Sequence, residues 1–199
     1  MMTVATAVTL LALTGGGWQD PEPRLRARLD SVTARAVEAI VDSARIRGLP
    51  TEPLIQKALE GRTKGAAGDR IVAAVGILLD GLGRSRQALG SAAGADELQA
   101  GALWFRAGGT AEQLGRLRHA APGRSLAVPI AVSAELLTRG WPPDEATLLL
   151  ERLFRARVSD AAFLSLRIGV NDALRGGASL VPAVRAEVAR LAPGGNRVP

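Results

Sequence analysis

Apolar residues recur every three or four positions between Arg24 and Arg47, with charged residues on the opposite side. The stripe consists of Leu25, Leu29, Val32, Ala36, Ile40 and Ala44, widened by Val37 and Val41. This spacing places the apolar side chains on one face of an α-helix. The segment is therefore predicted to form one amphipathic helix that packs against a core.

A helix, a tight turn and a second helix are predicted next. The first helix is expected to start after Thr51, a good N-cap residue, because Pro53 then falls in the first turn, where its missing N–H costs little. Two glycines, Gly61 and Gly65, are expected to end it. Over residues 69–83 apolar side chains cover most of the circumference of a helix. That helix is predicted to be the buried centre of the fold.

The rest of the chain is predicted to be a series of short helices. Residues 85–94 are rich in small side chains and are expected to connect the central helix to a short one at residues 96–105. Later helix starts are indicated by Thr110 with Gln113, by Ser125, by Pro142 and Pro143 before Asp144, by Ser159 and by Ser179. Pro129 lies close behind Ser125, so that helix is expected to begin later or to bend.

The pattern as a whole predicts a single all-α domain at residues 24–192. About eight short helices are expected, arranged as antiparallel helical hairpins around the 69–83 helix in a bundle or a short irregular solenoid. The last three of four recurring helix ends lie 33 and 36 residues apart, the length of a helical hairpin repeat, but tetratricopeptide and ankyrin signatures are absent. Repeated caps are also expected in any all-helical protein.

Those helix ends combine an arginine, a glycine and a residue that opens the next helix. They are Arg47-Gly48-Leu49-Pro50, Arg106-Ala107-Gly108-Gly109-Thr110, Arg139-Gly140-Trp141-Pro142 and Arg175-Gly176-Gly177-Ala178-Ser179. Arginine suits the negative end of a helix, and glycine adopts the left-handed conformation that ends it. Leu49 and Trp141 follow such glycines and are predicted to fold back as structural clamps; the alternative is that Trp141 is a partner-binding residue.

Both ends of the chain are predicted to lie outside the folded domain. Residues 3–13 form an apolar run that is too short to span a bilayer but has the length of a signal-peptide core, and Thr14 to Gly17 supply small residues for cleavage. The sequence thus predicts a signal peptide at residues 1–17, a leader at residues 18–23 and a periplasmic or secreted protein. The alternative is a buried N-terminal helix in a cytoplasmic protein. Residues 193–199 are predicted to be a disordered tail.

Composition supports the helical prediction and removes several kinds of site. The chain has 199 residues, 47% of them hydrophobic, which is enough for one sizeable core. It contains no cysteine, which excludes disulfides and thiolate metal sites, and one histidine, which is too few for the usual zinc sites. Aromatic residues make up only 3% and β-branched residues are scattered, as is typical of helical proteins. No metal or other cofactor is predicted.

The net charge of +6 is concentrated at the C-terminal end, where residues 151–199 hold eight arginines and four carboxylates. The densest cluster is Arg152, Arg155 and Arg157, which Arg185 and Arg190 would join if the last helix packs alongside. Aromatic residues that stack on bases are scarce, so no nucleic-acid partner is predicted. An anionic envelope polymer or lipid headgroup is the functional interpretation of this cluster; a solvated face is the simpler one.

Two lysines stand out in a chain with 23 arginines. Lys57 and Lys64 lie within eight residues of each other, with Glu60 between them. Lysine is a compact charge whose pKa responds to its surroundings, so these three residues are a candidate binding site. The simpler interpretation is an exposed Glu60–Lys64 ion pair beside a solvated Lys57.

No catalytic residue is predicted. His119 follows Arg116 and Arg118 at the end of a short helix, with no carboxylate at a fixed spacing, and is expected to contact solvent. Ser125 lies in a sequence that is similar to a nucleophile elbow, but no β-strand precedes it, so helix capping is the better assignment.

The run GLPTEPLIQKALEG…KG…DRIVAAV, from Gly48 to Val75, resembles a motif of uncharacterised bacterial proteins whose C-terminal part is all-helical and which are expected to be exported. The resemblance covers less than a sixth of the chain. It implies an exported, all-helical bacterial protein. It implies no catalytic residue, because no activity is assigned to such proteins.

These observations favour a non-enzymatic exported module that binds a protein partner or an anionic envelope component. The alternative is an enzyme, such as a hydrolase, on an uncommon helical scaffold with its site near the two lysines. A concave pocket that joins Lys57 and Glu60 with a second carboxylate, such as Asp69 or Glu52, would favour the enzyme. A flat or grooved surface with Leu49 or Trp141 exposed would favour binding.

Overall fold

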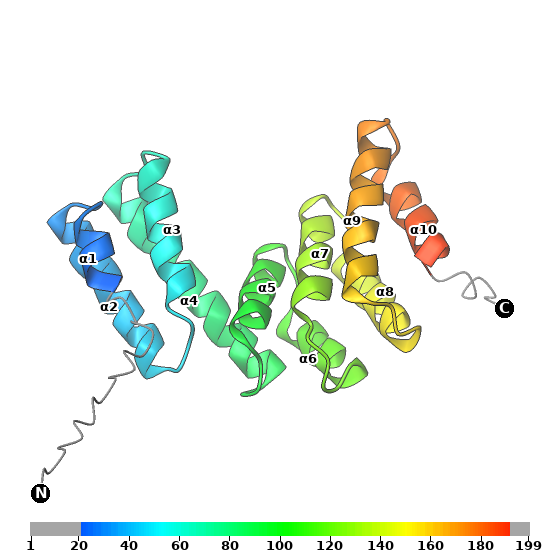
Figure 1. The fold of residues 1–199 in the computed structure, drawn as a ribbon, viewed down its shortest axis with the longest axis horizontal. Coiled ribbons are helices and arrows are strands. Elements are labelled where there is room, and N and C mark those ends of the chain that lie inside the picture. The colour runs from blue at the N-terminus through cyan, green and yellow to red at the C-terminus, as the bar shows by residue number, and fades with distance from the viewer. Residues whose placement is uncertain (1–20, 192–199) are drawn as a thin grey trace, which may run out of the picture.

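A computed structural model describes residues 21–191, and all regular secondary structure in them is α-helical, as predicted (Figure 1). The helices are α1 (Pro21–Arg26), α2 (Ser31–Ile46), α3 (Glu52–Thr63), α4 (Gly68–Leu89), α5 (Ala95–Arg106), α6 (Ala111–Ala120), α7 (Ala127–Thr138), α8 (Pro143–Arg155), α9 (Asp160–Arg175) and α10 (Leu180–Leu191). Within this range there are ten, so the expected number of about eight is not confirmed. The predicted signal peptide (1–17) and tail (193–199) lie outside the described residues.

One of the extra helices comes from a break in the first predicted helix. The Asp30 carboxylate accepts hydrogen bonds from the backbone N–H groups of Val32 (3.0 Å) and Thr33 (2.9 Å), which makes it the N-cap of α2. The pKa of Asp30 is lowered by hydrogen bonds from the Thr33 side chain, first, and then from the backbone N–H groups of Thr33 and Val32. Because the helix restarts here, Val32 is 69% exposed instead of belonging to the buried stripe.

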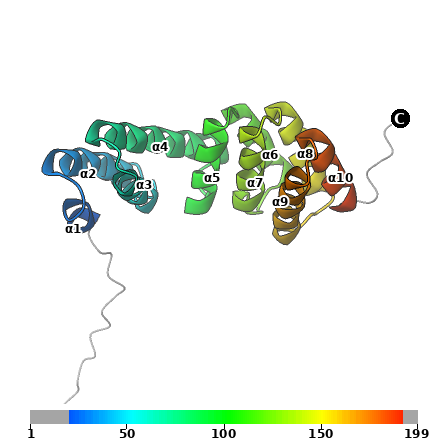
Figure 2. The same cartoon turned by 90° about the horizontal axis from the view of Figure 1, so that it is seen from above.

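The helices stack in two layers. In one layer α2 contacts α4, α4 contacts α6 and α6 contacts α8; in the other, α5 contacts α7 and α7 contacts α9. Figure 2 shows the two rows, with α3 in the row of α5, α7 and α9. We call α3, α5, α7 and α9 the odd layer. Between α2 and α9, each turn of the chain thus crosses from one layer to the other.

The predicted central helix is α4, which contacts α2, α3, α5 and α6. The helix was predicted to end near residue 83, but it continues to Leu89. The small residues near its end allow close approach: a Cβ added to Gly81 would lie 3.0 Å from the Cβ of Ala102 on α5. Ser85 is buried and donates a hydrogen bond to the Gly81 carbonyl (2.8 Å). Of the predicted connection at residues 85–94, residues 85–89 thus belong to α4, and residues 90–94 connect it to α5.

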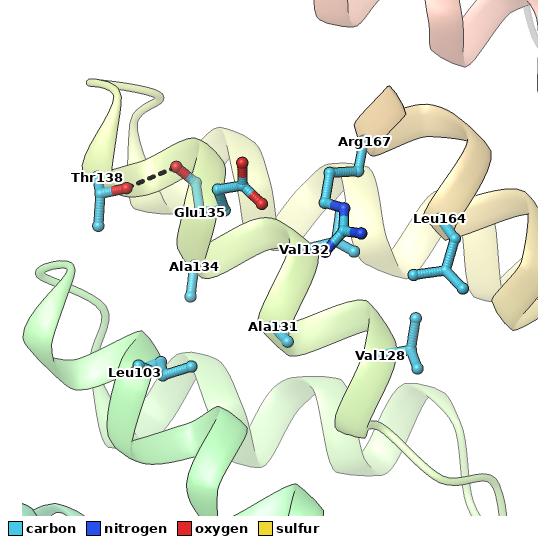
Figure 3. A pocket seen from close by; sticks show the side chains of 9 residues that line it. All are labelled: Leu103, Val128, Ala131, Val132, Ala134, Glu135, Thr138, Leu164 and Arg167. Atoms are coloured by element: carbon cyan, nitrogen blue, oxygen red, sulfur yellow. Dashed lines mark hydrogen bonds between the residues drawn. The ribbon is translucent and has the colours of Figure 1, made fainter. Parts of the chain in front are cut away.

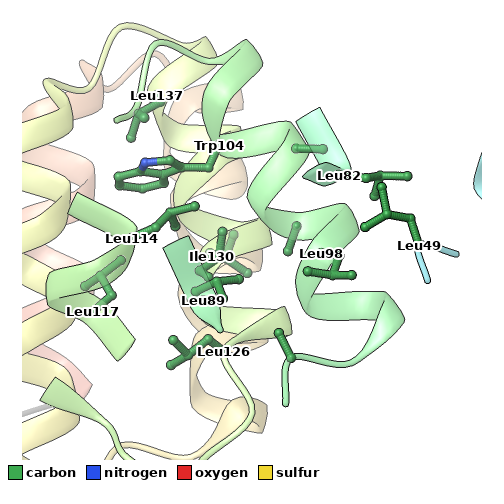
Figure 4. Packing of buried hydrophobic residues seen from close by; sticks show 14 of the residues in the cluster. Leu49, Leu82, Leu89, Leu98, Trp104, Leu114, Leu117, Leu126, Ile130 and Leu137 are labelled. Carbon is green, nitrogen blue, oxygen red and sulfur yellow. The ribbon is translucent and has the colours of Figure 1, made fainter. Parts of the chain in front are cut away.

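The core runs between the layers and is built from leucine, isoleucine, valine and alanine, with Trp104 at its middle (Figure 4). Trp104 is fully buried, and its indole N–H donates to the carbonyl of Thr110 (3.3 Å). Gly109 lies directly against this ring, because a Cβ at that position would be 2.0 Å from Nε1. Burial of this kind is the main stabilising contribution to a helical stack.

The recurring helix ends share one hydrogen bond. The N–H of Leu49 donates to the carbonyl of Ala44 (2.9 Å), and the N–H of Trp141 donates to the carbonyl of Leu136 (3.1 Å). The intervening Gly48 has a φ of +62°. This bond, with a glycine of positive φ, defines the Schellman motif. In the Arg175 motif the residue with positive φ is Gly177, not Gly176.

The end of α8 uses the same geometry without a glycine. Val158 donates to the carbonyl of Leu153 (3.0 Å), and the residue before it, Arg157, has a φ of +54°. A side chain in the left-handed region costs about 1–2 kcal/mol. The sequence pattern missed this end because it lacks glycine.

Three predicted helix signals are corrected. Thr51 occupies the N-cap position of α3, where the helix was predicted to start, but its side chain makes no capping hydrogen bond. Gly61 lies inside α3, where a Cβ would meet Ile71 of α4 at 2.9 Å, and only Gly65 follows the helix end. Ser125 is not the N-cap of α7, which begins at Ala127, so Pro129 falls in the first turn and removes no helical bond.

The capping predictions for Thr110 and Ser159 are confirmed. Thr110 and Gln113 form a capping box at the start of α6, with hydrogen bonds of 2.9 and 3.2 Å. The Ser159 hydroxyl accepts from the N–H of Ala162 (3.3 Å) at the start of α9.

Candidate functional site

The two lysines and Glu60 meet on the C-terminal half of α3. Lys57 Nζ donates to Glu60 Oε2 at 3.0 Å, and Lys64 Nζ donates to Glu60 Oε1. The hydrogen bonds from Lys64 and Lys57, in that order, lower the pKa of Glu60 to about 2. The carboxylate is thus ionised at neutral pH, with each oxygen bonded to an ammonium. Lys57 is not simply solvated, because it shares Glu60 with Lys64.

Lys57 and Glu60, but not Lys64, line an open groove between α3 and α5, which we call the α3/α5 groove, with a volume of about 580 Å³. Its lining comprises Pro50, Glu52, Pro53, Gln56, Lys57, Glu60, Leu78, Ala95, Gln99, Leu103 and Arg106. The groove joins Lys57 and Glu60 with a second carboxylate, Glu52, which is the arrangement expected of an enzyme site. Asp69, the other carboxylate considered, is not among the lining residues.

Both carboxylates of this groove are already occupied. Arg24 NH1 donates to both oxygens of Glu52 (3.1 and 3.0 Å), and the Gln56 amide donates to Glu52 Oε1 (2.6 Å). General acid–base catalysis needs a group that exchanges a proton near the working pH, and Glu60 cannot do so with a pKa of about 2. The groove offers charge and shape for binding more than groups for proton transfer.

The other candidate residues lie apart from this groove. Trp141 is only 5% exposed and Leu49 is 6% exposed, so both are clamps within the core and neither presents a contact surface. The indole N–H of Trp141 has no hydrogen-bond partner among the described residues. His119 is exposed in the last turn of α6, and Ser125 is exposed in the loop before α7.

Arg152, Arg155 and Arg157 are all exposed at the C-terminal end of α8 and make no ion pair with the residues that the structure describes. Arg185 and Arg190 lie on α10, whose main contact is with α9, and Arg190 pairs with Glu187. The structure therefore shows a solvated cationic patch on α8. It does not show the extended cluster that the sequence allowed.

A second groove lies on the odd layer, where α5 and α9 form the walls and α7 forms the floor (Figure 3). It has a volume of about 360 Å³ and is lined by Leu103, Val128, Ala131, Val132, Ala134, Glu135, Thr138, Leu164 and Arg167. We call it the α7 groove. Leu103 is 44% exposed and Leu164 is 40% exposed, so both leucines present apolar surface at the edges of this recess.

The two grooves meet at Leu103, which lines both. The exposed side of α5 is therefore a low ridge between two recesses of one continuous surface. The carboxylates along that surface form ion pairs, whereas two of its arginines form none with the residues that the structure describes. Glu52 and Glu60 are paired as described, and Glu135 accepts from Arg139 (2.8 Å). Arg106 and Arg167 make no ion pair with the described residues.

Sequence reasoning missed Leu103, Leu164, Arg106 and Arg167. One signal was present: α5 contains Leu98, Leu103, Trp104 and Phe105, which cannot all face one core because they span too wide an arc of a helix. Leu98 and Trp104 are fully buried, and Leu103 is the one left exposed.

Other site types find no support in the part of the chain that the structure describes. No group of three or more histidine, aspartate or glutamate side chains in residues 21–191 is placed to hold a metal ion. No helix in the same range has the length and apolar character that crossing a bilayer requires. Export to the periplasm or outside the cell stays a prediction, because its signal lies outside the described residues.

Comparison with known proteins returns no match to a family model, to a curated protein or to a solved structure. The resemblance of the Gly48–Val75 run to exported bacterial proteins therefore stays a prediction, and the candidate site rests on the geometry of this chain alone.

Proposed function

We propose that the protein is a non-enzymatic helical module that binds a segment of a partner protein along the exposed face of the odd layer. The observation that carries this proposal is the continuous surface of the α3/α5 groove and the α7 groove, joined at the exposed Leu103. Stacked helices often present extended surfaces of this kind to partners. An apolar recess with a polar rim is the usual form of such a binding site.

An enzyme at the α3/α5 groove is the weaker candidate. It is favoured by the meeting of Lys57, Glu60 and Glu52 in one recess. It is disfavoured because both carboxylates form ion pairs within the chain, Glu52 with Arg24 and Glu60 with two lysines. An anionic envelope component is a further candidate partner, for the arginine patch of α8. None of the arginines in that patch lines either groove.

The proposal is tested by selecting peptides from a random display library on the full, immobilised chain. Enriched peptides are expected to bind the native protein and to lose binding to the Leu103→Glu variant, because a carboxylate at the junction of both grooves would be buried against apolar side chains. Leu148→Glu is the matched control, because Leu148 is 55% exposed on α8, in the other layer. The proposal fails if no peptide is enriched, or if Leu103→Glu binds the peptides as tightly as Leu148→Glu does.

A further inference from the structure

Building on the proposed function, we infer that the α3/α5 groove receives an acidic amphipathic helix from the partner protein. The inference depends on three features of the described residues: an interruption of the odd layer, an apolar floor beneath it, and an excess of positive charge around it.

The odd layer is interrupted between α3 and α5. Along this layer α5 packs on α7 and α7 packs on α9, but α3 and α5 pack on α4 without a substantial contact with each other. Figure 1 shows α3 and α5 diverging on either side of α4, and the α3/α5 groove occupies this place. A helix laid on α4 here would occupy the position that a further odd-layer helix would have. Docking of a partner helix into such a groove is a common mode of recognition.

The floor and walls of the groove offer apolar contacts. Leu78 of α4 is half-buried and lies between the two walls, with Pro53 on the α3 side and Ala95 and Leu103 on the α5 side. Leucine or isoleucine side chains spaced three and four residues apart on a partner helix would reach this strip. A purely polar anion, such as a free phosphate, would leave Leu78 and Leu103 exposed to water.

The charges around the groove require acidic groups on that helix. Glu52 is paired with Arg24, and Glu60 is shared by two lysines, which leaves one lysine charge in excess. Arg106, on the opposite wall, is exposed and makes no ion pair with the described residues. A partner helix with carboxylates on its flanks would therefore gain pairs with Arg106 and with a lysine. A basic helix would meet uncompensated positive charge on both walls.

The test uses the peptides selected on the full chain. Peptides that bind through the groove are expected to carry carboxylates beside apolar residues at helical spacing, and to gain helical circular dichroism on binding. Fluorescence anisotropy then compares one selected peptide with its Glu→Gln version. The Gln version is expected to bind about tenfold or more weakly, and the difference is expected to shrink as salt is added.

Variants of the chain locate the binding site. Arg106→Glu is expected to weaken binding of the acidic peptide about tenfold or more. The matched control is Arg155→Glu, which changes an exposed, unpaired arginine on α8 and is expected to leave affinity unchanged. Both side chains are exposed, so both variants are expected to fold, and their circular dichroism spectra check this. Leu164→Glu changes only the α7 groove and is expected to have little effect.

The outcomes separate this inference from the proposed function. If selected peptides depend on Leu103 but are neutral or basic, or if Leu164→Glu abolishes binding and Arg106→Glu does not, the proposed function stands and this inference is wrong. If no selected peptide depends on Leu103, both are wrong. The inference is also overturned if vesicles of anionic phospholipid bind the chain in an Arg106-dependent manner and the acidic peptide does not.

Discussion

Glu97 is the side chain whose removal is expected to damage the fold most for its size. It is 8% exposed, and its carboxylate connects three parts of the stack. Oε2 accepts from the N–H of Gly94 at the start of α5 (3.1 Å), and Oε1 accepts from the buried N–H of Leu126 before α7 (2.8 Å). Oε1 also accepts from Arg118, which comes from the last turn of α6.

The cost of Glu97→Ala follows from what it leaves behind. The Leu126 N–H would lose its acceptor, which costs about 1–3 kcal/mol for a buried donor. Arg118 would lose its counter-charge while its Nε already has no partner among the described residues. Breaking a largely buried ion pair from one side costs about 3–5 kcal/mol, and because the two effects share one carboxylate, we expect a total in that range. Glu97→Gln keeps the shape and one acceptor oxygen and is expected to cost less.

The assay is urea unfolding followed by circular dichroism, with Asp80→Ala as the control. Asp80 is exposed in the middle of α4 and makes no hydrogen bond or ion pair with the described residues. The control is expected to change the free energy of unfolding by about 0.5 kcal/mol or less. A loss below about 1 kcal/mol for Glu97→Ala would refute the reasoning.

The pH dependence gives a second check. Burial raises the pKa of Glu97, but the hydrogen bonds from Leu126, Gly94 and Arg118 outweigh it and hold the pKa below its ordinary value of 4.5. A carboxyl with a lowered folded-state pKa contributes stability above pH 4.5, and that contribution is lost as the pH falls through the folded-state pKa. The stability difference between the native protein and Glu97→Ala should therefore shrink in acid. A difference that is independent of pH would contradict the assignment.

Three further predictions concern helix ends. Trp141→Ala should lower the free energy of unfolding by about 3–5 kcal/mol, as measured by thermal melts. Trp141→Phe keeps an aromatic ring and removes the unpaired N–H, so it should lower the free energy of unfolding clearly less. Arg157→Gly should raise the free energy of unfolding by about 1 kcal/mol, because glycine adopts a positive φ without strain. Gly140→Ala should lower the free energy of unfolding, because position 140 has a φ of +95°. Equal effects of the two substitutions would contradict the argument from backbone strain. Thr110→Ala should cost about 1 kcal/mol, and Thr51→Ala clearly less in urea unfolding, because only the Thr110 hydroxyl accepts a capping bond.

The all-α class and many helix ends could be predicted from sequence because they depend on local chemistry. A glycine after an arginine ends a helix wherever the chain lies, so the turns at Gly48 and Gly140 were predictable. The end of α4 was not, because Ser85 and its neighbours were read as a connection, whereas Ser85 packs against Gly101 of α5 within the helix.

The grooves could not be predicted for a related reason. Leu103 and Leu98 are the same residue type on one helix, and the packing of α5 against α4 and α7 decides which of them stays exposed. The lysine cluster was predictable as an ion-paired group because it lies within one helix. Its position opposite Arg106 depends on how α3 and α5 diverge from α4, which no local pattern records.

The long α4 also has a mechanical consequence. In the described part of the chain, α1–α3 and α5–α10 make no substantial contact with each other. Both groups pack on α4, which therefore connects them as two arms. The shape of α4 sets the angle between the two groups of helices, and its bending stiffness sets how far that angle fluctuates. Gly76, Gly81 and Gly83 lie along the middle of α4. A helix seated between α3 and α5 would touch both arms and brace them. Occupancy of the groove would then be felt at the far ends of the molecule as a change in stiffness, without any rearrangement of the helices themselves.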